Sequence, residues 1–497
     1  MLNELQLGSS LIIISYFAIS IVVVDAIFKK NKNVGFFYAL FGLILSLIAA
    51  GYNLYTATGS IVPTNPDDLL SSGMITFGGY SSFFDILFLV GGILTMIASR
   101  KYLKLHYFEY IEFYSLIIFS ITGMMLIGHA NNLLVLFIGI ELMSIPFYIL
   151  SGYFRNQISS VESALKYFLL GSFATGFLLY GIALIYGSTG SLDLSAISVV
   201  IQGGVQSQGL LLIGTGLVVI GLSFKIAIFP FHQWAPDVYH GAPTVVTAFM
   251  STAGKAAALL ALIIITKPLI PVFNVFSAKG VIDYNTIQVV IAIMSGLTML
   301  VGNISALVQK NVKRMLAYSS VAHAGYLLMG IVANNQLGWA GIAFYSTAYL
   351  FMQIGSFIIV SILEKENNEN LNISDYAGLS KSNPMLAALM ALFMFSLAGI
   401  PPMAGFFGKY YLFTATIKAG YTWLTIVAVI SSIISMYFYI GLVIQMYFKD
   451  RTDAIEKVKT GAANISVIIS AIAILVIGFY PPIITEIADK CFALFVM

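Results

Sequence analysis

Charge is the property that this sequence lacks most. Only 9% of its 497 residues are Asp, Glu, Lys or Arg, whereas a soluble domain carries about a quarter. Hydrophobic residues make up 59% of the chain and the mean hydropathy is +0.94. A soluble globule would need a charged surface that this composition cannot supply, and the abundant apolar residues exclude disorder. The composition therefore predicts an all-α, polytopic membrane protein.

Cysteine and the common nucleotide motifs are also missing. A single cysteine, Cys491, cannot build a disulfide framework, an iron–sulfur cluster or a thiolate zinc site. The chain has no GxGxxG after a strand, no phosphate-binding GK[ST] loop and no HExxH. Its net charge of +3 forms no basic stripe, so nucleic acid is not an expected partner. We expect no cofactor and no metal in this chain.

Long apolar runs are what the sequence does contain. A membrane-spanning helix needs about 20 mostly apolar residues, and reading the runs between polar or Gly/Pro breaks predicts about 14 such helices. The expected spans are 9–28, 36–56, 80–99, 109–128, 132–153, 160–186, 207–229, 243–266, 285–306, 315–333, 339–363, 385–417, 421–447 and 461–484. Most connections between them are short, so no soluble domain is expected.

The basic residues between these spans predict the orientation of the chain. Loops after odd-numbered spans hold sixteen: Lys29, Lys30, Lys32, Arg100, Lys101, Lys104, Arg155, Lys310, Lys313, Arg314, Lys365, Lys381, Lys449, Arg451, Lys457 and Lys459. The other side holds four: Lys267, Lys279, Lys418 and Lys490. Positively charged loops stay in the cytoplasm. The odd-numbered loops should therefore be cytoplasmic, and both termini should lie on the outer face.

Two spans contain helix breakers next to a lysine. Span seven reads SFKIAIFPFHQWAPDVYHGAP and span twelve reads FSLAGIPPMAGFFGKYYLF. Proline removes a helical hydrogen bond, so helices 7 and 12 should both be broken. Two broken helices five spans apart indicate two inverted five-helix repeats. The expected divisions are 1–107 for helices 1–3, 108–267 and 284–448 for the two repeats, and 449–497 for helix 14.

Four lysines, one clear glutamate and one histidine stand out within the expected spans, where an ionisable residue costs several kcal/mol and indicates function by default. They are Glu141, Lys166, Lys225, Lys255, His323 and Lys409. Helical rise places most of them near the middle of the membrane. Because they are spread over six helices at similar depth, they predict a chain of groups running parallel to the membrane rather than a pore.

Each of these residues also has a structural interpretation. Lys166 lies four residues after Glu162, in the favourable order for an ion pair within a helix. Lys225 and Lys255 could pair with carboxylates for assembly alone, and His323 could be a packing residue. Asp85 and His129 lie near span ends and indicate little. The functional interpretation is that burial disfavours the charged forms of Lys and Glu, so that these groups can take up and release protons.

Five segments together resemble the antiporter-like membrane subunits of respiratory complex I, and within them the subunit N (subunit 2) group. They are LFIGIELMSIPFYILSGYF, VESALKYFLLGSFATGFLLYGIALIYGSTGS, FKIAIFPFHQWAPDVYHGAPTVVTAFMSTAGKAAA, QKNVKRMLAYSSVAHAGYLLMG and FSLAGIPPMAGFFGKYYLF. The resemblance implies that Glu141 pairs with Lys225 and that Lys166 modulates this pair. It also implies that Lys255 is a central connecting lysine and Lys409 a terminal one. His323 and Glu162 would be an additional relay and the partner of Lys166.

The resemblance further implies a subunit of a proton-translocating NADH–quinone oxidoreductase in a bacterial inner membrane, more than in an organellar one. FMN, iron–sulfur clusters and quinone would then be bound by partner subunits, and antiporter-like subunit M and small subunits such as K and J would be neighbours. A cation/proton antiporter subunit of the Mrp type and a ferredoxin- or hydrogenase-linked relative remain alternatives. A purely structural scaffold is a third, which the set of charged residues disfavours.

Overall fold

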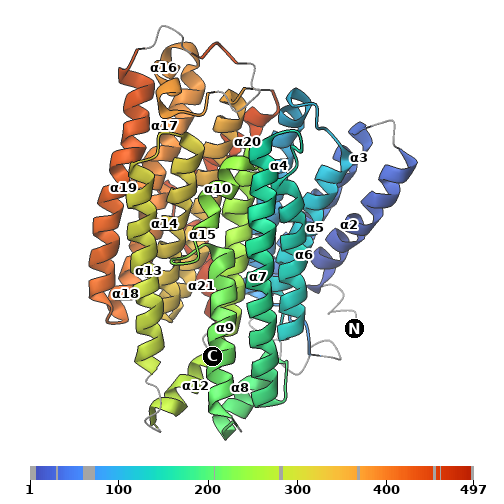
Figure 1. The fold of residues 1–497 in the computed structure, drawn as a ribbon, viewed down its shortest axis with the longest axis vertical. Helices are drawn as coiled ribbons and strands as arrows, with labels where there is room; N and C mark the ends of the chain where they lie inside the picture. Colours follow the sequence, from blue (N-terminus) through green and yellow to red (C-terminus); the bar gives the residue numbers. More distant parts are fainter. Residues whose placement is uncertain are drawn as a thin grey trace.

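The protein forms a bundle of helices running along its long axis (Figure 1). The computed structural model describes residues 7–28, 32–59, 73–205, 207–278, 284–365, 370–450, 455–458 and 461–493. Within these ranges every regular element is a helix, apart from three isolated antiparallel bridges. The all-α expectation is thereby confirmed.

The helices of the first half follow one another with short connections. They are α2 (Ser9–Ile27), α3 (Lys32–Gly59), α4 (Gly79–Leu105), α5 (Ile111–Gly128), α6 (Leu133–Ser151), α7 (Ile158–Thr189), α8 (Leu194–Gly203), α9 (Gln208–Ile226), α10 (Trp234–Gly241), α11 (Thr244–Phe249), the π-helical turn η2 (Met250–Gly254) and α12 (Lys255–Ala278).

The second half is built in the same way. Its elements are α13 (Tyr284–Leu307), α14 (Val312–Ala333), α15 (Gln336–Leu363), the 3₁₀ turn η4 (Ile373–Tyr376), α16 (Leu379–Ser382), α17 (Pro384–Ala398), α18 (Ala404–Lys418), α19 (Thr422–Phe448), α20 (Ala463–Phe479) and α21 (Pro482–Ala493).

Eleven helices in the described ranges are long and apolar enough to cross a membrane. The pair α20 and α21, bent by 80°, would make a twelfth if it forms one broken span. Helices α2 and α17, which fall in two further expected spans, are shorter apolar segments by the same test. The multi-span architecture is therefore confirmed, whereas the number 14 stays a prediction.

Both expected helix breaks are present. Helix α9 ends at Ile226, where Ala227 has a left-handed φ of 62°, and α10 begins only at Trp234. Helix α17 ends at Ala398, where Gly399 has a φ of 86°, and α18 begins at Ala404. A positive φ suits glycine and is uncommon for alanine, so the first break is the more constrained.

A third irregularity was not expected from the sequence. The π-helical turn η2 separates α11 from α12 immediately before Lys255, and all five of its residues are buried. Turns of this kind are rare and occur frequently at functional sites. No proline or glycine pair marks the position, so the wide turn depends on the packing of the surrounding helices.

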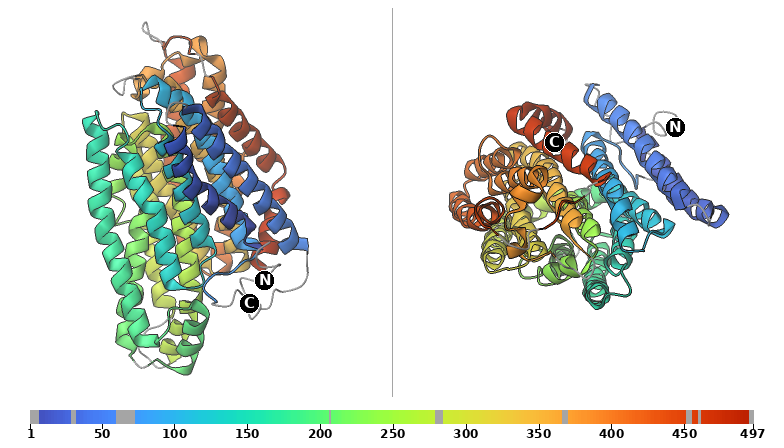
Figure 2. Two further views of the ribbon diagram at one scale, coloured as in Figure 1. Left: turned by 90° about the vertical axis from the view of Figure 1, so that its right-hand side faces the viewer. Right: turned by 90° about the horizontal axis from the view of Figure 1, so that it is seen from above.

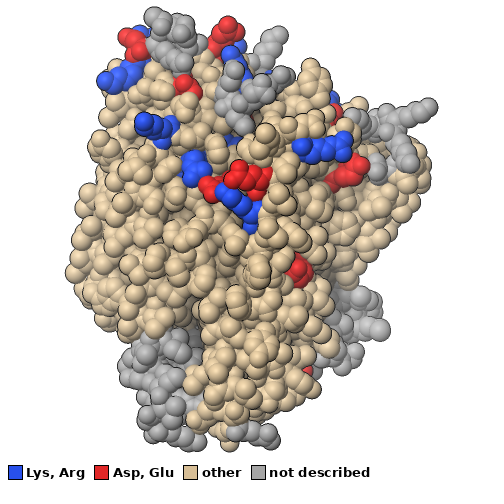
Figure 3. All heavy atoms as spheres, viewed as in Figure 1, with Lys and Arg blue, Asp and Glu red and all other residues tan. Residues whose placement is uncertain are grey.

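Charged side chains gather towards one end of the bundle. Figure 3 shows Lys, Arg, Asp and Glu over the upper part of one face, with an almost uncharged surface below. Of the basic residues that predict the orientation, Lys29, Lys30, Lys279, Arg451 and Lys459 lie outside the described residues, as do the side chains of Lys32 and Lys267. That this charged end faces the cytoplasm stays a prediction from the positions of the basic residues.

The first two helices, α2 and α3, lie along one edge of the bundle (Figure 2). Asp85 of α4 holds α2 against the bundle: its Oδ2 accepts a hydrogen bond from Ser10 Oγ at 2.9 Å and lies 3.0 Å from His129 Nε2. Both members of the Asp85–His129 pair are 1% exposed. Asp85 and His129 lie near helix ends, as expected, and it is neighbouring side chains rather than solvent that reach Asp85.

Candidate functional site

Glu141 lies midway along α6. Asn132 caps the start of this helix through its Oδ1, which accepts a hydrogen bond from the Leu134 amide. The Glu141 side chain is half-buried, and its Oε1 accepts a hydrogen bond from Thr175 Oγ1 of α7 at 2.9 Å.

Lys225, the lysine expected to pair with Glu141, bonds to hydroxyls instead. It is 5% exposed, and its Nζ donates to Ser144 Oγ and to Tyr148 Oη, both at 2.8 Å. Among the described residues, no ion pair within 4 Å joins Lys225 to Glu141. Ser144 and Tyr148 follow Glu141 by three and seven residues, so all three lie on one face of α6. That face connects the two charged groups.

Lys255 stands just after the π-helical turn and is 3% exposed. Its Nζ donates to the backbone oxygen of Ser320 at 2.7 Å and to Ser320 Oγ at 2.6 Å. The ring of Tyr239, from α10, lies 5.8 Å from the ammonium. Lys255 therefore joins the first half of the chain to α14 of the second half.

His323 continues the polar path from α14. It is 2% exposed, with Nδ1 at 2.6 Å from Tyr345 Oη and Nε2 at 3.0 Å from Tyr439 Oη. Tyr439 also hydrogen-bonds Ser319, the neighbour of the Ser320 that Lys255 contacts. Tyrosine hydroxyls and imidazole both donate and accept protons, so this cluster can pass a proton along its bonds.

Lys409 occupies the second helix break. It is 4% exposed, and its Nζ donates to the carbonyls of Leu397 and Ala398 at 3.1 Å and to Ser432 Oγ at 2.9 Å. These carbonyls end α17, where the helix dipole is negative. The ring of Tyr326 lies 5.0 Å from the ammonium.

The three buried lysines share one electrostatic feature. In the part of the chain that the structure describes, no carboxylate lies within 4 Å of Lys225, Lys255 or Lys409. The interpretation that Lys225 and Lys255 are ion pairs for assembly is therefore wrong. Burying an ammonium without a counter-charge is unfavourable. Each amine donates hydrogen bonds to nearby hydroxyl or carbonyl oxygens, which can accept from either the ammonium or the neutral amine.

Lys166 belongs to a different environment. Its side chain is 40% exposed, and its Nζ lies 2.7 Å from Glu162 and 2.8 Å from Asp237. The predicted pair with Glu162 is confirmed, but Lys166 contacts neither Glu141 nor Lys225 among the described side chains. Arg314 also bonds Asp237 at 2.8 Å. Burial raises the pKa of Asp237, but these two basic partners lower it more, so the carboxylate stays ionised.

One buried ion pair was missed by the sequence analysis. Lys313, counted above among the loop lysines, lies 3.7 Å from Glu364, and both side chains are 1% exposed. The only signal was an acidic residue directly after the apolar run 339–363, and nothing in that pattern names its partner. Across the described ranges, no three His, Cys, Asp or Glu side chains converge as ligands for a metal ion.

Interrupted apolar helices with buried lysines at the breaks are typical of membrane proteins that move ions. Residues 130–435, more than half of the chain, match the family model described as the transmembrane region of NADH:quinone oxidoreductase and Mrp antiporter proteins. The chain belongs to this family of antiporter-like membrane subunits.

Individual relatives agree with this assignment. The chain is 40% identical over 484 residues to NADH-quinone oxidoreductase subunit N of Trichlorobacter lovleyi, covering 96% of this chain and 95% of the relative. It is 30% identical to a chain of respiratory complex I from Thermus thermophilus with bound aureothin, at a TM-score of 0.78, covering 97% and 99% of the two chains. A chain of the Mrp complex from Dietzia sp. shares the fold at a TM-score of 0.84 and 19% identity, covering 98% and 97%.

Proposed function

We propose that this protein is the proton-translocating subunit N of a respiratory NADH–quinone oxidoreductase. Its membrane helices move protons while other subunits reduce quinone. The observation that supports this most strongly is the set of three buried lysines, Lys225, Lys255 and Lys409, held by neutral groups alone. Such amines can take up and release protons inside the membrane without breaking an ion pair.

The proton path runs laterally through both halves of the chain. Glu141 and Lys225 are joined by one face of α6, and Lys255 is joined to His323 through the Ser320–Ser319 segment and Tyr439. Water bridges the remaining gaps, because buried water binds where several polar groups face a common space. Lys409 ends the path next to the neighbouring subunit. Lys166, with its partner Glu162, tunes the charge at the cytoplasmic end of α7.

The two five-helix repeats have support in matching loops. The bridge between Asn132 and Asp193 and the bridge between Asn311 and Asn372 each join residues 61 positions apart. In each case the first asparagine caps a helix, α6 or α14 respectively. We assign the repeats to residues 108–267 and 284–448, with 1–107 and 449–497 flanking them.

The rest of the reaction takes place elsewhere in the complex. FMN, iron–sulfur clusters and quinone are held by partner subunits, and this chain acts as the translocating part of the enzyme. Its membrane neighbours are antiporter-like subunit M and small subunits such as K and J. The complex lies in the inner membrane of a bacterium, with the charged end of this chain in the cytoplasm and both termini outside.

The experiment that tests this function replaces Lys255 by methionine in the whole complex. Methionine keeps the apolar stem and removes the proton-carrying amine. We expect an assembled complex in which proton uptake by membrane vesicles and quinone reduction both fall. Lys381→Met is the control, because Lys381 is 73% exposed and pairs with Asp450 at the surface. Wild-type pumping by assembled Lys255→Met complex would refute the proposed function.

A further inference from the structure

The buried pair of Lys313 and Glu364 lies at the charged end of the bundle, outside the lateral path. Glu364 follows the last residue of α15, and its Oε2 accepts hydrogen bonds from Tyr102 Oη at 3.0 Å and Thr244 Oγ1 at 2.5 Å. Lys313 donates to the backbone oxygen of Ala242 at 3.0 Å. The pair thus joins α4, α11, α14 and α15 at one point.

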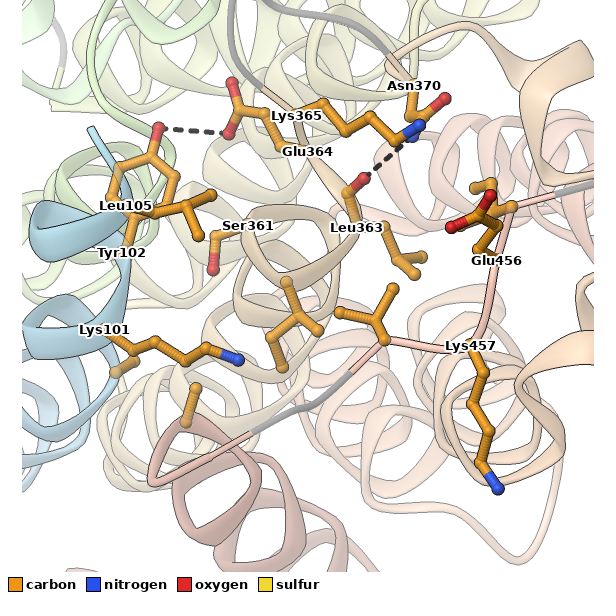
Figure 4. A pocket seen from close by; sticks show the side chains of 15 residues that line it. Lys101, Tyr102, Leu105, Ser361, Leu363, Glu364, Lys365, Asn370, Glu456 and Lys457 are labelled. Carbon is orange, nitrogen blue, oxygen red and sulfur yellow. Dashed lines mark hydrogen bonds between the residues drawn. The ribbon is translucent and has the colours of Figure 1, made fainter.

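A cavity of about 340 Å³ adjoins this pair. Figure 4 shows Glu364, Lys365 and Asn370 along the upper part of its wall, Tyr102 on the left, and Lys101 reaching in from the lower left. A water molecule needs only about 10–15 Å³ of such volume, so the cavity has room for several waters. The Glu364 carboxylate is therefore a buried acid beside a space that water can fill.

A buried polar face leads from Glu364 to Lys255. Thr244, Thr247, Ser251 and Lys255 are spaced by three or four residues, so they follow one side of α11, the π-helical turn and the start of α12. The first of them bonds Glu364 and the last is the central lysine. The helical rise makes the separation about 16 Å.

The helix opposite, α15, packs against α11 and the π-helical turn and carries a polar atom without a partner. Gln353 is fully buried, and its Nε2 donates to the Leu316 carbonyl. Its Oε1 has no hydrogen-bond partner among the described residues. Buried polar atoms are almost always paired, so a water molecule is the expected partner of this oxygen. One turn before Gln353 in α15, the centre of the Tyr349 ring lies 4.8 Å from the centre of the His323 ring.

We propose that Glu364 takes up protons from this cavity and supplies them to Lys255, with Lys313 as its positioning counter-charge. The inference rests on the proposed function, because it gives the lateral path a source of protons. The Glu364 carboxylate accepts one proton from a cavity water and becomes a neutral acid. That proton passes to water beside Gln353 and is accepted by the neutral amine of Lys255. One proton moves, the carboxylate is restored, and no electrons are transferred.

The test compares variants of the assembled complex in membrane vesicles. Glu364→Gln keeps the size of the side chain but carries no proton. The double variant Lys313→Met/Glu364→Gln removes both charges, so that neither is left buried alone. Glu109→Gln is the matched control: Glu109 is also buried at the charged end, near Arg100 and Lys104, but is not part of the polar face.

The pH dependence of pumping separates proton uptake from a structural role. The titratable and charged groups that face Glu364 are Lys313, Tyr102 and Tyr376, with Lys101, Lys365, Glu456 and Lys457 on the cavity wall. Without the carboxylate, uptake depends on free protons, which fall tenfold for each unit of pH. We expect both variants to lose pumping about tenfold more at about pH 8 than at about pH 7, whereas a structural defect lowers both rates by one factor.

Three results would overturn the inference: wild-type pumping in the variants, an equal loss at both pH values, or failure of both variants to assemble. The last would mean that the pair is structural. The Lys255→Met complex keeps the two proposals apart. If Lys255→Met abolishes pumping and Glu364→Gln does not, only the uptake route is wrong. If neither substitution reduces pumping, the proposed function is wrong as well.

Discussion

Replacing Lys409 by methionine should damage the protein in two ways that can be measured separately. In the proposed path this amine is the terminal proton carrier, so pumping should fall. The same amine also holds the end of α17, by donating to the carbonyls of Leu397 and Ala398. The last carbonyls of a helix have no partner within the helix. The substitution therefore leaves polar groups of the second helix break without their donor.

The loss of stability caused by Lys409→Met can be worked out by comparing it with the loss caused by Lys255→Met. Both substitutions remove a buried lysine amine. The effect of removing it on stability is therefore common to both variants and cancels when their stability changes are subtracted. Lys255 bonds Ser320, which lies inside α14, where its carbonyl keeps a helical hydrogen bond. After Lys409→Met, Ala398 keeps only a 3.5 Å contact from Ser432 and Leu397 loses its donor. One orphaned carbonyl costs about 1–3 kcal/mol, so we expect a difference of about 2 kcal/mol.

The assay is the rate of irreversible thermal inactivation of the purified complex, with pumping measured on vesicles at a lower temperature. Each 1.4 kcal/mol corresponds to a factor of ten, so Lys409→Met should inactivate about 25-fold faster than Lys255→Met if the lost bonds are broken before the barrier. Equal inactivation rates would refute the structural role of Lys409 at the break. Normal pumping by Lys409→Met would refute its role as a proton carrier.

Three further predictions concern other parts of the molecule. Glu141→Gln should assemble and lose most pumping with little change in stability, as measured by proton uptake and native gels; full pumping would make Glu141 structural. Burial lowers the pKa of His129, but Asp85 and the Thr76 carbonyl raise it more, to a net value above the ordinary one. The pair therefore stabilises the protein fully below about pH 6.5, and the thermal stability lost in Asp85→Asn should shrink as the pH rises above that value; a constant difference would contradict this. In Gly181→Ala the new Cβ would lie 2.7 Å from a backbone oxygen of α9, whereas Gly176 on the same helix has nothing within 4 Å, so the first variant should lower the yield of assembled complex and Gly176→Ala should not.

Hydropathy was sufficient to predict the helical architecture and three of the buried charges, but it missed the buried Lys313–Glu364 pair. Long apolar runs leave the chain no alternative to membrane helices, because every backbone polar group in lipid must bond within its own helix. An ionisable residue within such a run is therefore buried or paired wherever the helices pack, as Lys225, Lys255 and Lys409 are. The breaks near Pro230 and Pro402 were predictable for a similar local reason, since proline cannot continue the hydrogen bonds of a helix.

The partners of these charges were decided only by the tertiary structure. Lys225 was expected to pair with Glu141, but the amine meets α6 further along the same face, at Ser144 and Tyr148. Lys313 and Glu364 meet because α14 and α15 run side by side, and neither residue signals the other over the 51 positions between them. Burial depends on the composition of each helix alone, whereas contact depends on the rotation and depth of two helices relative to each other. The amino-acid pattern therefore identified the three lysines buried within the apolar helices, and packing decided which groups they contact.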